Sequence, residues 1–325
     1  MDMARTGPLL TFVINVRNGE KYIHDAISSA LGQTVPCEVL VVDNQSTDST
    51  REVVGRFPTV RILSTPHSMT LGAARNFSLG LIATPYVTWL DSDDLVDSKF
   101  AETYLATFEE FRHVGFLSSG CALIDGVGNL LPRVAQRPYF YPDVGEVVPR
   151  IFGDSLQYCA ATGFMRGAWV SYAFRTDLVR QVGGFDVGLH YAEDFDLILR
   201  LCCITSSLHV LANLASCRVH SEQVTQTMSL EARAAERQMV IDSALRRFGF
   251  SSREYVSYLK ANIAVEKMIE AMRSRKKGVA SLRLVNADVS VKMFLLVLFQ
   301  KVSNRISNKL YRTFGMSRFE QVIAS

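Results

Sequence analysis

Residues 9–48 read LLTFVINVRNGEKYIHDAISSALGQTVPCEVLVVDNQSTD, and the alternation of residue types in them sets the architecture of the chain. The run begins with apolar and β-branched residues at 9–16, which predict a buried strand. Residues 21–31 place apolar side chains at helical spacing, and a second apolar run follows at 39–42. A strand, an amphipathic helix and another strand in this order are typical of a parallel βαβ unit.

The same alternation continues outward from this stretch. It predicts strands at 60–63, 86–90, 169–175 and 208–214, and helices at 49–57, 71–81, 99–111 and 195–203. Residues 125–165 are rich in Gly, Pro and aromatic residues and predict a mobile loop region. We therefore predict an α/β fold with a mostly parallel central sheet in residues 1–227, followed by a helical C-terminal region in residues 228–325.

The composition of the 325 residues is that of a globular protein, with 48% hydrophobic residues, 35 Lys and Arg, and 32 Asp and Glu. It excludes a disordered or fibrous protein. Residues 273–325 contain 11 of the basic residues and 2 of the acidic ones, so residues 1–272 contain 24 basic and 30 acidic residues. We therefore expect no nucleic-acid partner, but a basic C-terminal surface.

Cysteine spacing and hydropathy indicate the compartment. The six cysteines include no C-x-x-C pair, and no signal peptide precedes them. The longest unbroken apolar run, residues 293–299, has seven residues, whereas a membrane-spanning helix needs about 20. We expect reduced thiols, a cytoplasmic location and no transmembrane helix.

Acidic residues follow two of the predicted strands. Asp43 follows the strand at 39–42, and Asp91-Ser92-Asp93-Asp94 follows the strand at 86–90. Because the carboxyl ends of parallel strands meet at one edge of a sheet, these carboxylates can bind a base or ribose there, or a hard cation such as Mg²⁺ or Mn²⁺. A solvated acidic turn or a helix cap explains the same residues equally well.

A third acidic pair, Glu193-Asp194, precedes the helix predicted at 195–203. A helix N-terminus stabilises a carboxylate, and a general base also has to be ionised, so both interpretations stay open. His220 lies in a polar stretch after the strand at 208–214. With Cys217 it would make half a zinc site, but no second Cys or His pair has suitable spacing, and zinc is not expected.

Other catalytic motifs do not fit the chain. No G-x-G-x-x-G follows a strand, which argues against a dinucleotide cofactor. Residues 115–120 have the glycine spacing of a P-loop but continue with Cys121-Ala122 instead of Lys-Ser or Lys-Thr, so we interpret the match as chance. Neither G-x-S-x-G nor H-E-x-x-H occurs.

Four ordered blocks between residues 8 and 225 resemble the family 2 glycosyltransferases. They are residues 12–57 with Asn18-Gly19-Glu20 and residues 41–48, Gly72-Ala73-Ala74-Arg75-Asn76, Trp89-Leu90-Asp91-Ser92-Asp93-Asp94, and Gly183-Gly184-Phe185-Asp186 with Glu193-Asp194-Phe195-Asp196-Leu197. The resemblance implies a GT-A fold with a nucleotide-binding domain. It also implies transfer of a sugar from a nucleotide-diphosphate sugar, expected to be UDP-linked, with inversion at the anomeric carbon.

The resemblance also implies roles for individual residues. Asp194 matches the catalytic base. Binding of the nucleotide sugar is assigned to Asn15, Arg17, Asp43, Arg75, Asp91, Ser92 and Glu193, with Asp43 at the base. A Mg²⁺ or Mn²⁺ ion is assigned to Asp93, Asp94 and His220, of which His220 is the looser match.

The C-terminal residues bear on the acceptor. The Q-x-x-R-W motif of processive relatives is not supplied by Gln223-Val224-Thr225-Gln226, which favours addition of a single sugar. From Leu295 to Leu310, apolar residues at helical spacing run beside Lys301, Arg305 and Lys309. Such a helix can lie on an anionic membrane surface, on the inner face of the cell membrane, or pack on the catalytic domain. A saccharide or lipid-linked saccharide acceptor, in surface polysaccharide or glycolipid assembly, is expected.

Two other functions are open. An inactive sugar-nucleotide-binding scaffold that docks to a membrane complex would use the same fold, although the joint presence of the four acidic residues Asp43, Asp91, Asp93 and Asp194 argues against it. A sugar-phosphate nucleotidyltransferase shares the sheet type but needs a Gly-rich phosphate loop after the first strand, and none is found.

Overall fold

The computed structural model describes residues 7–131, 149–152 and 168–221, with isolated residues between 223 and 243. The chain divides into two compact units, Met1–Cys159 with Phe164–Ser229, and Leu230–Ser325 with Ala160–Gly163. All further description concerns the first unit. The amphipathic segment from Leu295 to Leu310 lies outside the described residues, and the domain boundary after residue 227 stays a prediction.

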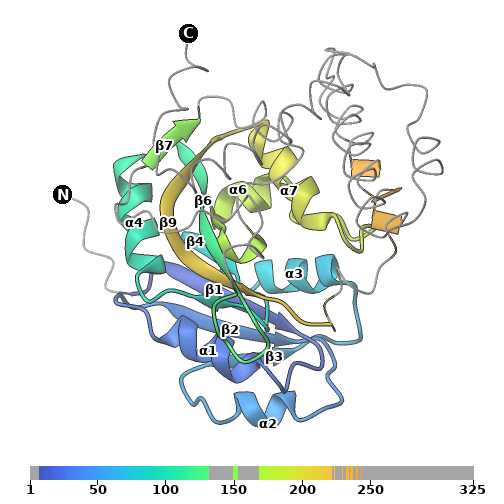
Figure 1. The fold of residues 1–325 in the computed structure, drawn as a ribbon. Helices are drawn as coiled ribbons and strands as arrows, with labels where there is room; N and C mark the ends of the chain where they lie inside the picture. Colours follow the sequence, from blue (N-terminus) through green and yellow to red (C-terminus); the bar gives the residue numbers. More distant parts are fainter. Residues whose placement is uncertain are drawn as a thin grey trace, which may run out of the picture. The chain divides into compact units, whose positions relative to one another are not determined.

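A nine-stranded mixed sheet forms the core of the described part of the chain. Its first half is parallel, in the order β3 (Arg61–Ser64), β2 (Glu38–Asp43), β1 (Leu10–Val16) and β4 (Tyr86–Trp89). Its second half continues with β8 (Ala173–Arg175), β6 (Val114–Ile124), β9 (Ser206–Arg218) and β5 (Leu95–Val96), and β7 (Pro149–Phe152) pairs with β9. In Figure 1, β9 curves across the sheet beside β6, to which it is parallel.

Only β5, β7 and β8 run against the other strands of this sheet, so the predicted α/β fold with a mostly parallel sheet is confirmed. The helices that connect the strands are α1 (Ile23–Leu31), α2 (Thr50–Val54), α3 (Leu71–Leu79), α4 (Phe100–Glu110), α6 (Thr176–Gln181) and α7 (Glu193–Cys202). Helix α1 buries Ile23, Ala26, Ile27 and Ala30 against the core, because the spacing of these residues places them on one face.

The largest departure from the sequence prediction is β6, which was not expected as a strand. All of its residues are buried, so it lacks the alternation of apolar and polar residues that marks a half-exposed strand. A Cβ atom at Gly115 would lie 2.3 Å from Thr205 Cγ2, and one at Gly120 would lie 2.4 Å from Asn213 Oδ1. The two glycines therefore allow β9 and Thr205, the residue before it, to approach β6. Residues 115–120 lie within this strand and form no phosphate-binding loop, so their P-loop spacing is a chance match, as predicted.

Two further predictions need correction. The loop predicted at 125–165 contains β7, which pairs antiparallel with β9. The strand predicted at 169–175 begins as a 3-10 helix, Trp169–Ser171, and only its last residues form β8. Among the described residues, no helix combines the length and apolar character that crossing a membrane requires.

Candidate active site

The site lies at the carboxyl ends of β1, β2 and β4, which are neighbours in the parallel half of the sheet. Asn15 and the exposed Arg17 are at the end of β1, Asp43 is the last residue of β2, and Asp91 follows β4. The parallel topology thus brings the predicted acidic residues to one edge, where open α/β sheets bind ligands.

The loops after β1 and β2 are held together by hydrogen bonds. The Asn18 backbone N–H donates to Ser46 Oγ at 2.9 Å, and the Thr47 N–H donates to Asn18 Oδ1 at 2.8 Å. The Gly19 N–H donates to Thr50 Oγ1 at 2.8 Å. Asn18 has a φ of 57°, a left-handed conformation that Asn tolerates better than most residues. The edge is therefore pre-organised by its own loops.

Asp43, the last residue of β2, is buried at this edge of the sheet. Its side chain is only 1% exposed, and its Oδ1 accepts a hydrogen bond from the Ser46 N–H at 3.0 Å. Its Oδ2 accepts one from Ser64 Oγ at 3.5 Å and lies 3.8 Å from Nε of the exposed Arg51. Ser46 and Ser64 thus hold the carboxylate of Asp43, the residue that the family resemblance assigns to the base of the donor.

Arg75 on α3 connects two of the acidic blocks. Its Nη1 donates to Glu193 Oε1 at 2.9 Å, and its Nη2 donates to Asp91 Oδ1 at 3.0 Å. Its side chain is only 3% exposed, and the guanidinium lies 4.6 Å from the centre of the Trp169 ring. One buried cation therefore holds the acidic motif after β4 against the start of α7.

The neighbouring residue explains how α3 and α7 meet. Asn76 Nδ2 donates to the Phe185 carbonyl at 2.8 Å, and the Phe185 N–H donates to Asn76 Oδ1 at 2.7 Å. Gly184 has a φ of +71°, and a Cβ atom there would lie 2.3 Å from Asn76 Oδ1. Only glycine fits this turn, which holds α3 against the segment between α6 and α7.

Three buried polar atoms around Arg75 have no hydrogen-bond partner among the described residues. They are Asn15 Oδ1, Trp169 Nε1 and Glu193 Oε2. Asn15 also belongs to this neighbourhood, because its Nδ2 donates to the carbonyl of Ala74 at 3.1 Å. An unsatisfied buried polar atom costs about 1–3 kcal/mol, so such a group indicates ligand-binding atoms.

Two carboxyl groups near Arg75, those of Asp194 and Asp91, have raised pKa values. Burial raises the pKa of Asp194 to about 7, with a contribution from the charge of Glu193, while Arg75 opposes the rise. Desolvation also raises the pKa of Asp91 to about 6, against the effect of Arg75 and with that of Asp93. Asp194 Oδ1 accepts a hydrogen bond from the Phe195 N–H at 2.6 Å. A carboxylate with a pKa near neutrality suits a general base.

Asp93 and Asp94 point to different partners. Asp93 Oδ2 lies 2.8 Å from His220 Nε2. The buried Asp94 accepts a hydrogen bond through Oδ1 from the Arg218 N–H at 2.8 Å, and its pKa lies well above the usual range because of desolvation and the charges of Asp93 and Asp91. The structure therefore brings His220 to Asp93 and directs Asp94 towards the end of β9.

Asp93 and His220 could bind a divalent cation only together with oxygen atoms of a substrate. No group of three or more His, Cys, Asp and Glu side chains in the described part of the chain is arranged to hold a metal by itself. Mg²⁺ and Mn²⁺ sites typically use one or two carboxylates together with phosphate oxygens of the substrate. Asp93 with His220 would meet this requirement if the phosphate oxygens of a substrate completed the set, and the repulsion among the neighbouring carboxylates favours a cation.

Sequence reasoning missed two residues of this region. Trp169 was expected only as the start of a strand, and Arg218 only as part of a polar stretch. A signal for Trp169 exists, since it is one of two tryptophans in the chain. Arg218 could have been noticed as a cation at the carboxyl end of an apolar strand.

The fold and its acidic edge define an open α/β domain with a candidate ligand site at the carboxyl ends of its strands. Comparison with known families places it more closely, because the model "Glycosyl transferase family group 2" matches residues 86–261 and "Glycosyl transferase family 2" matches residues 11–141. The chain belongs to glycosyltransferase family 2.

Individual proteins show the same relationship. The chondroitin synthase of Escherichia coli is 25% identical over 256 residues, which are 76% of this chain and 34% of that protein, so the chain spans about a third of the length of this relative. The crystal structure of S. aureus TarS 1–349 in complex with UDP-GlcNAc has a TM-score of 0.67 at 17% identity, over 96% of this chain and 93% of that one.

A second solved structure is more distant. The mannosyltransferase PcManGT from Pyrobaculum calidifontis, in complex with GDP-Man and Mn²⁺, has a TM-score of 0.53 at 14% identity, over 96% of this chain and 90% of that one. These two likenesses concern the fold, and they confirm the expected GT-A type of α/β architecture.

Proposed function

We propose that this chain is an inverting, metal-dependent glycosyltransferase that moves a single sugar from a UDP-sugar to an acceptor hydroxyl. The observation that carries the proposal is the Arg75 bridge, which joins Asp91 to Glu193 and so sets the Asp194 carboxylate beside the acidic motif. A nucleotide-binding edge and a carboxylate with a near-neutral pKa are thereby part of one site.

The donor is bound by groups from three strand ends. Asp43 and the hydrogen-bonded loops around it hold the base, and Asp91 holds the ribose. Ser92 lies near the loop after β1, since a Cβ atom at Gly19 would be 3.3 Å from its Oγ. The unpartnered atoms of Asn15, Glu193 and Trp169 supply hydrogen bonds to the remainder of the donor.

Asp93 and His220 are the residues that would hold a Mg²⁺ or Mn²⁺ ion, because their side chains meet and Asp94 is engaged with the backbone of Arg218. Such an ion supplies positive charge against the diphosphate leaving group. The Mn²⁺ bound by PcManGT with GDP-Man supports this part of the proposal. Arg75 offsets part of the negative charge of its two carboxylate partners and keeps them aligned.

Asp194 accepts the proton of the acceptor hydroxyl as that oxygen attacks the anomeric carbon from the face opposite the diphosphate. A single carboxylate on that face is what an inverting reaction needs. Phe195 holds one carboxylate oxygen through its N–H, which orients the other for the proton.

The acceptor is a saccharide or a lipid-linked saccharide, in keeping with a relative named chondroitin synthase. We place the protein in the cytoplasm, with residues 293–325 on an anionic membrane surface. Deletion of residues 293–325 should then abolish binding to anionic vesicles, and equal binding by the shortened chain would refute the membrane proposal.

Transfer itself tests the proposal. The wild-type protein and Asp194→Asn are incubated with UDP-sugars, acceptor saccharides and Mn²⁺, and product formation and its anomeric configuration are followed by NMR. We expect an inverted product from the wild type alone, while both proteins bind UDP. Full turnover by Asp194→Asn would remove this residue as the base, and nucleotide binding without transfer to any acceptor would favour a scaffold.

A further inference from the structure

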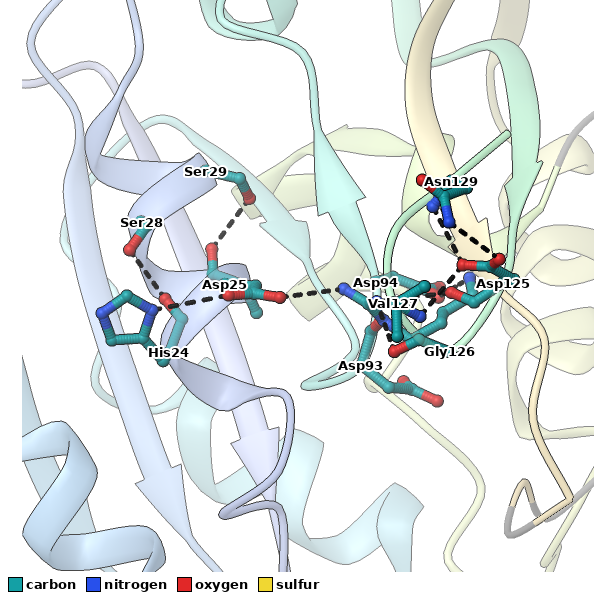
Figure 2. Close-up of polar contacts among 12 residues, drawn as sticks. His24, Asp25, Ser28, Ser29, Asp93, Asp94, Asp125, Gly126, Val127 and Asn129 are labelled. Atoms are coloured by element: carbon teal, nitrogen blue, oxygen red, sulfur yellow. Dashed lines mark hydrogen bonds and ion pairs between the residues drawn. The ribbon is translucent and has the colours of Figure 1, made fainter. Parts of the chain in front are cut away.

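A buried arginine lies at the end of β9, outside the residues to which a role has been given above. The Arg218 side chain is only 1% exposed. Its Nε donates to the Asp93 carbonyl at 2.8 Å, its Nη1 to the Gly126 carbonyl at 3.2 Å, and its Nη2 to Asp25 Oδ2 at 3.2 Å. Figure 2 labels Asp25 on one side of the view and Asp93, Asp94 and Gly126 together on the other.

Arg218 therefore joins segments that are far apart in the sequence. Asp25 belongs to α1, Asp93 to the acidic motif after β4, and Gly126 to the turn after β6. The guanidinium also lies 4.7 Å from the centre of the Tyr22 ring, on the residue that precedes α1. The arginine fork suits this arrangement, because it donates in several fixed directions from one plane.

The same short segment fixes both of the last two aspartates of the motif. The Arg218 N–H holds the Asp94 carboxylate, and the Arg218 guanidinium holds the Asp93 carbonyl. Two residues further on, His220 contacts the Asp93 carboxylate and lies with its ring 4.9 Å from that of Tyr22. Backbone and side chain of Asp93 are thus both held from the end of β9.

Stability alone is a weak reason for this arrangement. A buried guanidinium is costly to desolvate, and its carboxylate partner among the described residues, Asp25, is 54% exposed. The other side-chain hydrogen bonds of Arg218 go to backbone carbonyls. The shortest side-chain hydrogen bond of Arg218 goes to the carbonyl of Asp93 in the acidic motif. The buried charge of Arg218 therefore indicates a role in the geometry of that motif.

We propose that Arg218 is a positioning residue that sets the Asp93 carboxylate and His220 in the geometry required for a divalent cation and a nucleoside diphosphate. The inference rests on the proposed function, because it assigns the cation to Asp93 and His220. It goes beyond that function by making metal-dependent nucleotide binding depend on a residue that contacts neither ligand.

The experiment compares two substitutions of similar arginines. Arg218→Lys keeps the charge but loses the fork. Arg175→Lys is the matched control, because Arg175 Nε also donates to a carbonyl, that of Val114 at 2.8 Å, and its guanidinium lies 5.4 Å from the Tyr86 ring centre, away from the acidic motif. UDP affinity is measured by calorimetry on the full chain at a series of Mn²⁺ concentrations.

We expect Arg218→Lys to lower UDP affinity at limiting Mn²⁺ at least tenfold, and additional Mn²⁺ to restore part of it, whereas Arg175→Lys stays within twofold of the wild type. Restoration by the metal is a response that a general loss of packing would not give. Should Arg218→Lys fail to fold, Asp25→Asn decides, because it removes the exposed partner of Arg218, and a loss of about threefold is expected.

The outcomes separate this inference from the proposed function. Suppose that the wild type binds UDP only with Mn²⁺. If Arg218→Lys, or Asp25→Asn used in its place, then binds UDP as the wild type does, the positioning role alone is overturned. An equal loss in Arg175→Lys also overturns it. Wild-type protein that binds no nucleotide with Mn²⁺ overturns the proposed function, and the positioning role with it.

Discussion

Replacing the proposed base should make the protein more stable, and the gain should depend on pH. The pKa of Asp194 rises from 3.8 to about 7 in the folded chain, chiefly through burial. A carboxyl group whose pKa is higher in the folded state holds its proton more tightly there. Its ionisation therefore lowers stability as the pH rises from about 4 to about 7, and the full cost is present above that range. Asp194→Asn cannot ionise and avoids this cost.

The size of the effect follows from the same values. A rise of about 3 pKa units, at about 1.4 kcal/mol each, gives an upper bound of about 4 kcal/mol. Because Asp194 is partly exposed, solvent screening reduces the effect, and we expect Asp194→Asn to gain about 1–3 kcal/mol at pH 8. About a quarter of the gain should remain at pH 4.5 by the same linkage.

Urea unfolding of the full chain at pH 8 and pH 4.5 measures this difference. Asp196→Asn, two residues along α7, is the control, because Asp196 Oδ2 accepts from Arg200 Nε at 2.8 Å in a buried ion pair. Breaking that pair should cost about 3–5 kcal/mol, the opposite sign. An Asp194→Asn variant that is no more stable than the wild type at pH 8, or equally stabilised at both pH values, would refute the reasoning.

Three other results are expected. Arg75→Met leaves the buried Glu193 carboxylate without its cation and should cost about 3–5 kcal/mol in urea unfolding. Arg56→Met, which breaks an exposed pair, should cost less than about 0.5 kcal/mol, and similar costs for the two variants would contradict the bridge. Gly184→Ala, at a φ of +71°, should lower the free energy of unfolding by more than about 1 kcal/mol in the same assay. Gly55→Ala, at a φ of −59°, should lower it by less, and equal effects would contradict the turn geometry. The value of kcat/KM for transfer should rise with pH through about 7 as Asp194 ionises, and a flat profile would count against it as the base.

The parallel half of the fold could be predicted because its signals are local. Strand β1, helix α1 and strand β2 each show their own apolar periodicity, and the topology that follows places Asp43 and Asp91 at one edge. Strand β6 could not be predicted in this way. Its glycines are needed because β9 packs closely against β6, and β9 lies about 90 positions further along the chain.

The site shows the same division. The identities of the acidic residues were visible in the sequence, but the contact between Arg75 and Glu193 joins residues 118 positions apart. Arg218 was missed because its partners are carbonyl groups, which every residue has, and a carboxylate 193 positions away. Hydrogen bonds of this kind follow from the tertiary fold, and no local sequence pattern predicts them.

The central claim is that the acidic edge binds a nucleotide through a divalent cation. Isothermal titration of UDP and GDP into the full chain, each with Mn²⁺ and with EDTA, tests it most directly. We predict that UDP binds in Mn²⁺ and that binding is lost in EDTA, with GDP weaker. Binding of neither nucleotide, or equal UDP binding in Mn²⁺ and EDTA, would contradict the account.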